Sequence, residues 1–402
     1  RRVSSHDPAL FMSLDALRAH FPHTNHQIYL NHAATSPLSQ PVVAAMQAYL
    51  GERHGADPEA PVDNFMEVLP VLEATKERIA AVLKTTVDRV AFAPNTSYAL
   101  NILTQGLRWR SGDRIAIPDG TFPTNAYPFL NLERHGVTVD FIPTDEGAYT
   151  VEDVARTITP NTRLVSISWV HFLSGFRADL NAIGQLCADR DVLFCVDAIQ
   201  GLGAFQMDVD AWNIDFLACG GHKWLMAPQG TGLLYCTEAL QAQIDPPAGW
   251  LHGPVDWEHL DDYTLTFHDT AERFRLGTTN NVGLLGLNAA LDLYLDAGPV
   301  QCEARTRTNA RRLADGLADL GVSRYGSDDP SHASGIVTMA PDHPEALFEH
   351  LKARGITGAL RNRKLRLAPA WYTSATEIDT ALAAIEAFHD STPTASPVSP
   401  AE

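Results

Sequence analysis

The sequence predicts an α/β fold with one large, mostly parallel sheet, and two observations support this. Short apolar, β-rich runs alternate with longer helical patterns between residues 41 and 321, which is the order of elements in a sheet covered by helices. A chain of 402 residues with 45% apolar and 19% charged residues is typical of a folded, enzyme-sized protein. Seven apolar runs are the predicted strands, at residues 89–92, 114–117, 137–142, 163–167, 192–196, 215–219 and 232–236.

Helical patterns surround these strands and continue beyond them. Residues 70–84 and 282–296 place apolar side chains at the spacing of one helix face. A strand-like run follows at residues 335–339, and Ser374 with Glu377 forms a capping-box pattern at the start of the last helix. The expected parts are an N-terminal segment, a large domain, a smaller C-terminal α+β domain and a disordered tail rich in Ser, Pro and Thr, over residues 1–28, 29–298, 299–390 and 391–402.

Charge and composition exclude several classes of partner. The chain has 30 Lys and Arg against 48 Asp and Glu, a formal charge of −18, which repels phosphate backbones and anionic lipid surfaces. We therefore expect no nucleic-acid or membrane partner. The first residues lack the apolar core of a secretory signal, and the five cysteines contain no Cys-x-x-Cys pair, so the expected location is the cytoplasm.

Several catalytic motifs are absent from the sequence. It contains no dinucleotide-binding or P-loop glycine motif, no His-Glu-x-x-His and no Gly-x-Ser-x-Gly. His23 and His26 are close together but have no third ligand nearby in sequence, so we expect no metal site.

Two polar groups follow neighbouring strand candidates. Asp197 ends one buried run, and Lys223 follows the next in Gly-Gly-His-Lys-Trp. Open α/β sheets bind ligands at the carboxyl ends of their strands. A lysine buried there has a lowered pKa and is a candidate Schiff-base nucleophile. These two residues alone fit a structural ion pair equally well.

A third feature suggests an anion site. The run at residues 90–94 leads into Asn95, Thr96 and Ser97 at a predicted helix start, where free backbone N–H groups and the helix dipole bind anions. A plain N-cap explains these residues as well. Together, an anion site, a carboxylate and a lysine at neighbouring strand ends describe a site for a phosphorylated, cationic, aldehyde-bearing ring, and pyridoxal phosphate fits all three.

The sequence resembles the class V aminotransferase family of pyridoxal-phosphate enzymes, the fold type I group that includes cysteine desulfurases, selenocysteine lyases and isopenicillin N epimerase-like proteins. The likeness extends from Tyr29 to Tyr372. Its most specific motif is Asp-Ala-x-Gln at residues 197–200 followed by Gly-His-Lys at residues 221–223. Further landmarks are the segments at residues 122–125, 175–180 and 273–278.

The resemblance implies a role for each matching residue. Lys223 would carry the cofactor as a Schiff base, and Asp197 would keep the pyridine nitrogen protonated. The catalytic set is thus Lys223, Asp197 and His222. The other cofactor-binding residues would be Gln200 at the phenolic oxygen, Phe122 stacked on the ring, and Thr96, Ser97 and His222 at the phosphate. Thr278 would reach the phosphate of a neighbouring subunit, which implies a homodimer with shared active sites.

The substrate implied by the resemblance is a small amino acid. Arg366 would hold its carboxylate, for which a planar guanidinium suits better than an ammonium group. His32 and His171 are further candidates for substrate binding. Arg361 and Arg363 lie near Arg366 in sequence and compete for the carboxylate role.

Four departures from the family pattern bear on the reaction. Residues 355–366 contain no cysteine, whereas desulfurases carry a nucleophilic cysteine there. Gly220 replaces a Ser or Thr, Arg275 replaces a frequent Glu, and His171-Phe172 replaces an Asn common in desulfurases. The missing cysteine favours transamination or epimerisation at Cα, and the other changes indicate a different substrate pocket and phosphate site. The alternatives are a cysteine desulfurase-like or selenocysteine lyase-type C–S(e) lyase and, in another class, a non-catalytic dimeric scaffold.

Overall fold

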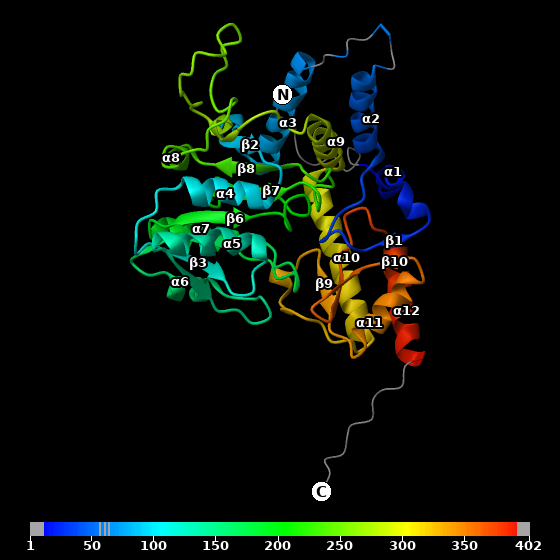
Figure 1. Ribbon diagram of the computed structural model, residues 1–402. Helices are drawn as coiled ribbons and strands as arrows, with labels where there is room; N and C mark the ends of the chain where they lie inside the picture. The colour runs from blue at the N-terminus through cyan, green and yellow to red at the C-terminus, as the bar shows by residue number, and fades with distance from the viewer. Residues whose placement is uncertain (1–11, 56–57, 60–61, 63–64, 392–402) are drawn as a thin grey trace.

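The structure is a computed structural model that describes residues 12–55, 58–59, 62 and 65–391 of the chain (Figure 1). The tail predicted to be disordered lies outside these residues except for Ser391, as do residues 1–11 of the predicted N-terminal segment. The described α-helices are α1 (Leu14–Ala19), α2 (Gln40–His54), α3 (Phe65–Leu83), α4 (Thr96–Gly106), α5 (Tyr127–Leu130), α6 (Val151–Thr157), α7 (Leu180–Asp189), α8 (Glu238–Gln241), α9 (Asn281–Ala297), α10 (Pro299–Asp319), α11 (Pro344–Lys352) and α12 (Ala375–Ser391).

A seven-stranded sheet forms the centre of the larger part of the molecule, as the sequence predicts. Its strands are β2 (Val90–Phe92), β3 (Arg114–Pro118), β4 (Thr138–Ile142), β5 (Thr162–Ser168), β6 (Leu193–Asp197), β7 (Phe216–Gly220) and β8 (Gly232–Cys236). The spatial order is β2-β8-β7-β6-β5-β3-β4, and only the pairings made by β8 are antiparallel. Each predicted strand agrees with an observed one to within a residue or so at either end.

Alternate residues of the central strands enter two separate apolar cores. In β6, Phe194 and Val196 pack on one face and Cys195 on the other, as the two-residue period of a strand requires. Helices α3, α7 and α9 contribute to the first core, and α4, α5 and α8 contribute to the second. The sheet is therefore covered on both faces, which explains why its strands appear in the sequence as continuous apolar runs.

A smaller group of elements follows α10, which runs from α9 into this group in Figure 1. Strands β11 (Ala359–Arg361), β12 (Lys364–Leu367) and β9 (Val337–Met339) form an antiparallel sheet in that order. A third apolar core lies between this sheet and helices α10, α11 and α12. Most of β9 and β12 is thus buried, and Arg366 projects from a rigid strand.

The N-terminal part of the chain packs against this C-terminal group. Strand β1 (Ile28–Tyr29) pairs in parallel with β10 (Ile356–Thr357), and a β-bridge joins Asn31 to Ala368. Leu30 is fully buried in the third core. Contacts between the two ends of the chain therefore place residues 28–36 beside β12.

The predicted helix at residues 70–84 begins earlier than expected. It is α3, which begins at Phe65 and contains Pro70 in its interior. The sequence favoured a start at Pro70 because proline is common in the first turn of a helix. None of the described helices is both long and apolar enough to cross a membrane.

The predicted capping box at the start of α12 is present. The Ser374 hydroxyl accepts from the Glu377 N–H at 3.2 Å, and the Glu377 carboxylate accepts from the Ser374 N–H at 2.8 Å. We expect Ser374→Ala to lower the free energy of unfolding by about 1 kcal/mol, measured by urea denaturation, because a helix N–H loses its partner. Ser391→Ala, at the exposed end of the same helix, is the control and should be nearly neutral. Equal stability of both variants and the unmutated protein would contradict the capping role.

Candidate active site

A small pocket lies at the carboxyl ends of the parallel strands. Strands β3 and β5 are neighbours in the sheet, but β4, which comes between them in sequence, lies on the outer side of β3. Ligands bind at such a reversal of strand order in open α/β sheets. The residues that line the pocket are Phe122, Ser168, Val170, Phe172, Asp197, Ile199, Gln200 and Lys223.

Asp197 ends β6 at the floor of this pocket. It is only 4% exposed, and burial raises the pKa of its carboxyl group to about 6. The backbone N–H of Ile199 donates to Oδ1 at 3.1 Å and opposes this shift, as does the charge of Lys223. Such a carboxylate is stabilised further by a cation or an acidic N–H group placed opposite it.

Lys223 follows β7 and is 9% exposed. Burial lowers the pKa of its amine to about 8, the negative charge of Asp197 opposes this shift, and the positive charge of Arg366 adds to it. Lys223 and Asp197 form no ion pair within 4.0 Å in the described structure, so the ion-pair interpretation lacks its contact. Nζ lies 5.6 Å from the centre of the Phe122 ring. With a pKa of about 8, the Lys223 amine has a larger neutral fraction near neutral pH than an ordinary lysine amine has.

Gln200 is buried beside Asp197, and both ends of its amide group are fixed. Nε2 donates to the carbonyl of Ala33 at 2.9 Å, and Oε1 accepts from Nε1 of Trp224 at 3.0 Å. One N–H of Nε2 is left over after the bond to Ala33. Gln200 can therefore donate one further hydrogen bond to a group in the pocket.

The candidate phosphate residues lie around the start of α4. Asn95 is the N-cap, and its side chain accepts from the N–H of Tyr98 at 2.8 Å. Thr96 is buried and accepts from the Gly220 N–H at 2.9 Å, which joins the helix start to the end of β7. Ser97 lies on the surface with its hydroxyl 3.0 Å from that of Thr124. The Thr96 oxygen is thus already engaged, while Ser97 is open to a ligand.

His222 lies next to Gly220, whose N–H donates to Thr96 at this helix start. A Cβ atom at Gly220 would lie 3.3 Å from the His222 ring and 3.0 Å from Ile199. A Ser or Thr at position 220 would therefore crowd both neighbours. A side chain at position 220 thus requires small shifts of His222 and Ile199, and glycine leaves the end of β7 without the hydroxyl group that the family pattern has there.

Arg366 is a buried cation without an acidic partner among the described residues. It is 3% exposed, and burial lowers the pKa of its guanidinium to about 10. Nη1 donates to the carbonyl of Phe172, while Nε is buried with no partner. Phe172 in turn packs edge-on against Phe122 with ring centres 5.2 Å apart. An anion that lies beside Arg366 would thus also lie beside the wall of the Lys223 pocket. Arg361 and Arg363, the competing candidates, lie on the surface.

Two predicted substrate residues already have protein partners at both ring nitrogens. His171 Nδ1 lies 2.9 Å from the Ser174 hydroxyl, and its Nε2 lies 3.1 Å from the carbonyl of Gly120. His32 contacts Ala368 and Tyr372 in the same way, at 2.9 and 2.7 Å. Neither ring has a free nitrogen for a substrate, so the structure favours supporting roles for both histidines.

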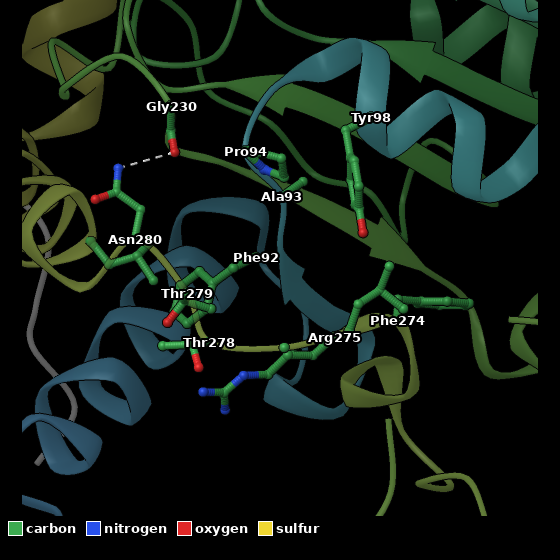
Figure 2. A pocket seen from close by; sticks show the side chains of 13 residues that line it. Phe92, Ala93, Pro94, Tyr98, Gly230, Phe274, Arg275, Thr278, Thr279 and Asn280 are labelled. Atoms are coloured by element: carbon green, nitrogen blue, oxygen red, sulfur yellow. Dashed lines mark hydrogen bonds between the residues drawn. The ribbon is translucent and has the colours of Figure 1, made fainter. Parts of the chain in front are cut away.

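Thr278 lies in a different pocket from Lys223. Figure 2 shows this pocket with Thr278, Thr279, Asn280 and Arg275 on one wall and Tyr98 on another. The amide of Asn280 donates to the carbonyl of Gly230 at 3.4 Å, whereas the Arg275 Nε is buried without a partner. Within one chain, Thr278 is therefore not part of the Lys223 pocket.

Sequence reasoning did not identify Ser168 or Val170 as residues of the pocket, and it named Phe172 only as part of the His171-Phe172 departure from the family pattern. Ser168, Val170 and Phe172 continue from β5 with alternate residues facing the pocket, and Ser168 is the register partner of Asp197. The two-residue spacing after a predicted strand was the signal that could have found them. Trp224 follows Lys223 directly, but its bond to Gln200 depends on the fold.

Comparison with known proteins identifies the family. Residues 28–358 match the family model "Aminotransferase class-V". The chain is 31% identical over 335 residues to a "Probable cysteine desulfurase" of Methanothermobacter thermautotrophicus, with 82% of each chain covered. A solved structure of the apo cysteine desulfurase of Thermococcus onnurineus NA1 has a TM-score of 0.85 and 26% identity, covering 97% of this chain and 100% of that one. A structure of the cystine C–S lyase C-DES with its reaction product cysteine persulfide, 22% identical, shares the fold with a TM-score of 0.83 over 91% of this chain and 99% of that one.

The chain belongs to the class V aminotransferase family, and its fold is that of the fold type I enzymes. Members of this family depend on pyridoxal phosphate. The residues present fit this cofactor, because a buried lysine with a lowered pKa, a buried carboxylate and a spare amide donor line one pocket. The prediction of pyridoxal phosphate is thereby confirmed, while the individual roles of the site residues stay predictions.

The charge of Arg366 gives a testable effect on Lys223 in the protein without cofactor. Replacement of Arg366 by Met removes a positive charge that disfavours the charged amine, so we expect the pKa of Lys223 to rise above about 8. Labelling of Lys223 by an amine-reactive reagent, followed by mass spectrometry across pH, should then shift its midpoint to higher pH. Arg363→Met, which removes an exposed charge from the same hairpin, is the control. An unchanged midpoint in Arg366→Met would contradict the electrostatic link.

Proposed function

We propose that this protein is a pyridoxal-phosphate-dependent lyase that breaks the Cβ–S bond of a sulfur-containing amino acid without forming a persulfide on the enzyme. The observation that carries the proposal is that all five cysteines are buried, while Lys223, Asp197 and Arg366 converge on one site. The named relatives support a lyase rather than the transamination or epimerisation that the sequence favoured.

The cofactor would be held by residues from several strand ends. Asp197 would bind the pyridine nitrogen, Gln200 the phenolic oxygen, and Ser97 with His222 the phosphate. When bound, pyridoxal phosphate links covalently to a lysine amine and withdraws electrons from Cα of an amino acid. Phe122 would cover a face of the ring, since it lines the same pocket as Asp197 and its ring centre lies 5.6 Å from the Lys223 amine.

Arg366 is the proposed substrate anchor. Its Nε is unpartnered, and no acidic group of the described structure neutralises it, so a substrate carboxylate would supply both a charge and an acceptor. The hydrogen bond from Nη1 to Phe172 holds the guanidinium beside the pocket. Phe122 and Phe172 then leave an apolar space for the side chain of the amino acid, which suits a sulfur atom because sulfur packs well against aromatic rings.

Lys223 is the proposed base. A neutral amine with a pKa near 8 can accept the Cα proton, and a positioned base contributes roughly 10²–10⁴-fold to the rate. The electron pair of the C–H bond becomes a Cα–Cβ double bond, and the pair of the Cβ–S bond leaves with sulfur. Sulfur departs as a thiolate or persulfide anion and takes up a proton. Water then hydrolyses the unsaturated amino acid to pyruvate and ammonia.

We also propose a homodimer in which Thr278 reaches the site of the second copy. The support is that Thr278 lies in a pocket apart from Lys223 of its own chain. Exposed apolar side chains lie nearby in sequence, including Trp250 and Trp257. Such side chains are common in interfaces between proteins.

The reaction products test the proposed function. With L-cystine as substrate, the holoenzyme should release pyruvate and ammonia in equal amounts together with cysteine persulfide, measured by a lactate dehydrogenase assay and by trapping of the persulfide. Lys223→Ala should lose at least about a hundredfold in rate. Alanine in place of pyruvate would indicate a desulfurase, and a 2-keto acid formed with loss of the cofactor band would indicate transamination. Either result would overturn the lyase proposal.

Alkylation of thiols separates this reaction from one that uses a cysteine nucleophile. Burial raises the pKa of Cys187, Cys195 and Cys302 to about 12, and that of Cys219 and Cys236 also rises, so no thiolate is available near neutral pH. Iodoacetamide should therefore leave the native holoenzyme fully active, whereas all five cysteines should react once the chain is denatured. Loss of activity in step with one alkylated cysteine would contradict the proposal.

A further inference from the structure

A short segment of the chain, residues 30–36, lies between β12 and the floor of the Lys223 pocket, and we call it the linking segment. On one side, the carbonyl of Leu30 accepts from the Ala368 N–H at 2.7 Å. On the other side, the N–H of Ser36 donates to the carbonyl of His222 at 2.9 Å. The linking segment thus contacts the strand that carries Arg366 and the loop that carries Lys223.

The side chain of His32 makes the main polar contacts on the β12 side. Its Nδ1 lies 2.9 Å from the carbonyl of Ala368, and its Nε2 lies 2.7 Å from the hydroxyl of Tyr372. A carbonyl can only accept, so Nδ1 must carry the proton and Nε2 must accept from the tyrosine. Since the fully buried His32 ring is satisfied on both sides, it has one stable orientation.

Tyr372 is held rigidly for this contact. Its ring stacks on Phe21 with centres 3.9 Å apart and planes at 8°. The turn that carries it is fixed by Asn309, whose amide donates to the carbonyls of Ala370 and Thr373 at 2.9 Å each. The hydroxyl of Tyr372 therefore reaches His32 from a position that the rest of the C-terminal group determines.

On the pocket side, the next residue of the linking segment fixes a cofactor contact. The carbonyl of Ala33 accepts from Gln200, whose amide oxygen is in turn bound by Trp224. His32 and Ala33 are adjacent in the chain, but the bond to Gln200 is made by the backbone carbonyl of Ala33 and does not involve the Tyr372 hydroxyl. The linking segment thereby connects the strand of the proposed substrate anchor to the floor of the pocket through one continuous set of hydrogen bonds.

We propose that His32 and Tyr372 act as a pair of positioning residues that hold β12, and with it Arg366, at a fixed place relative to the Lys223 pocket. The proposal rests on the proposed function only in that Arg366 binds a substrate carboxylate. Neither side chain touches the substrate. His32 is thus reassigned from substrate binding to positioning, and Tyr372 gains a role that its sequence context does not suggest.

The contact between His32 and Tyr372 does not change with pH over the working range. Burial lowers the pKa of His32 to about 3 and raises the pKa of Tyr372 well above its ordinary value, so both stay neutral across the working pH range. Removal of the hydroxyl leaves a buried ring nitrogen without its donor. The cost of such an unpaired buried group corresponds to roughly a tenfold change in an equilibrium constant.

The test is Tyr372→Phe, which keeps the ring stacked on Phe21 and removes only the hydroxyl. The probe is L-alanine, an amino acid without a leaving group at Cβ, titrated into the holoenzyme and followed by the visible absorbance of the cofactor. We expect its Kd to rise about tenfold, because Arg366 loses its fixed position. The Kd of the apo-protein for pyridoxal phosphate, followed by tryptophan fluorescence, should change by less than about threefold, because Gln200 keeps its bonds to Ala33 and Trp224.

Tyr294→Phe is the matched control, since it removes a buried tyrosine hydroxyl that has no hydrogen-bond partner. Its Kd for L-alanine should equal that of the unmutated enzyme. His32→Leu should raise the Kd at least as much as Tyr372→Phe, and the double variant should add little to His32→Leu because the hydroxyl acts through the ring.

Three outcomes would overturn the proposal: an unchanged Kd for L-alanine in Tyr372→Phe, additive effects in the double variant, or a rise in both Kd values of the same size. Failure of the lyase proposal is distinguishable from these outcomes. A holoenzyme that yields no pyruvate from L-cystine still binds L-alanine through its carboxylate, so the comparison between variants remains decisive.

Discussion

Burial of two cations, Lys223 and Arg366, that act electrostatically on each other is the constraint on which this site depends. Lys223 and Arg366 are both almost fully buried, and Asp197 is the only acid among the residues that line the pocket. Burial of a charge without a partner costs free energy. The consequence differs between Lys223 and Arg366. The lysine amine is pushed toward its neutral form, whereas the guanidinium stays charged and is left with an unpartnered N–H group. The proposed function uses the first group as a base and the second as an anion receptor.

The parallel sheet makes this arrangement possible because it brings residues from distant parts of the chain to one edge. Asp197 and Ser168 are register partners at the ends of β6 and β5, and Lys223 follows the neighbouring β7. Phe122 enters from beyond β3, on the other side of the reversal in strand order. Arg366 comes from a separate sheet, so its place depends on contacts between the two parts of the molecule rather than on the large sheet itself.

The sequence predicts the large sheet well because strands buried on both faces appear as uninterrupted apolar runs. Asp197 and Lys223 are predictable for a related reason, since a polar residue directly after such a run is unusual. The surroundings of His32 are not predictable in this way. Its partners Ala368 and Tyr372 lie 336 and 340 residues away in the chain. No local sequence pattern predicts a contact between residues so far apart. The resemblance to a family therefore implied that His32 binds the substrate, whereas in the structure Ala368 and Tyr372 contact both of its ring nitrogens.

The composition of the pocket also restricts which leaving group the reaction can expel. Phe122 and Phe172 carry no titratable proton, and His171 is engaged by Ser174 and Gly120, so Lys223 and Asp197 are the lining residues whose pKa values lie near neutral pH. In the proposed reaction Lys223 would take the Cα proton and Asp197 would hold the cofactor, so a leaving group that is stable as an anion would be favoured. A sulfur group of low pKa leaves more readily than one of high pKa. In the proposed reaction a persulfide anion expelled from a disulfide amino acid would meet this requirement better than a simple thiolate, which is why we propose cystine rather than cysteine as the substrate.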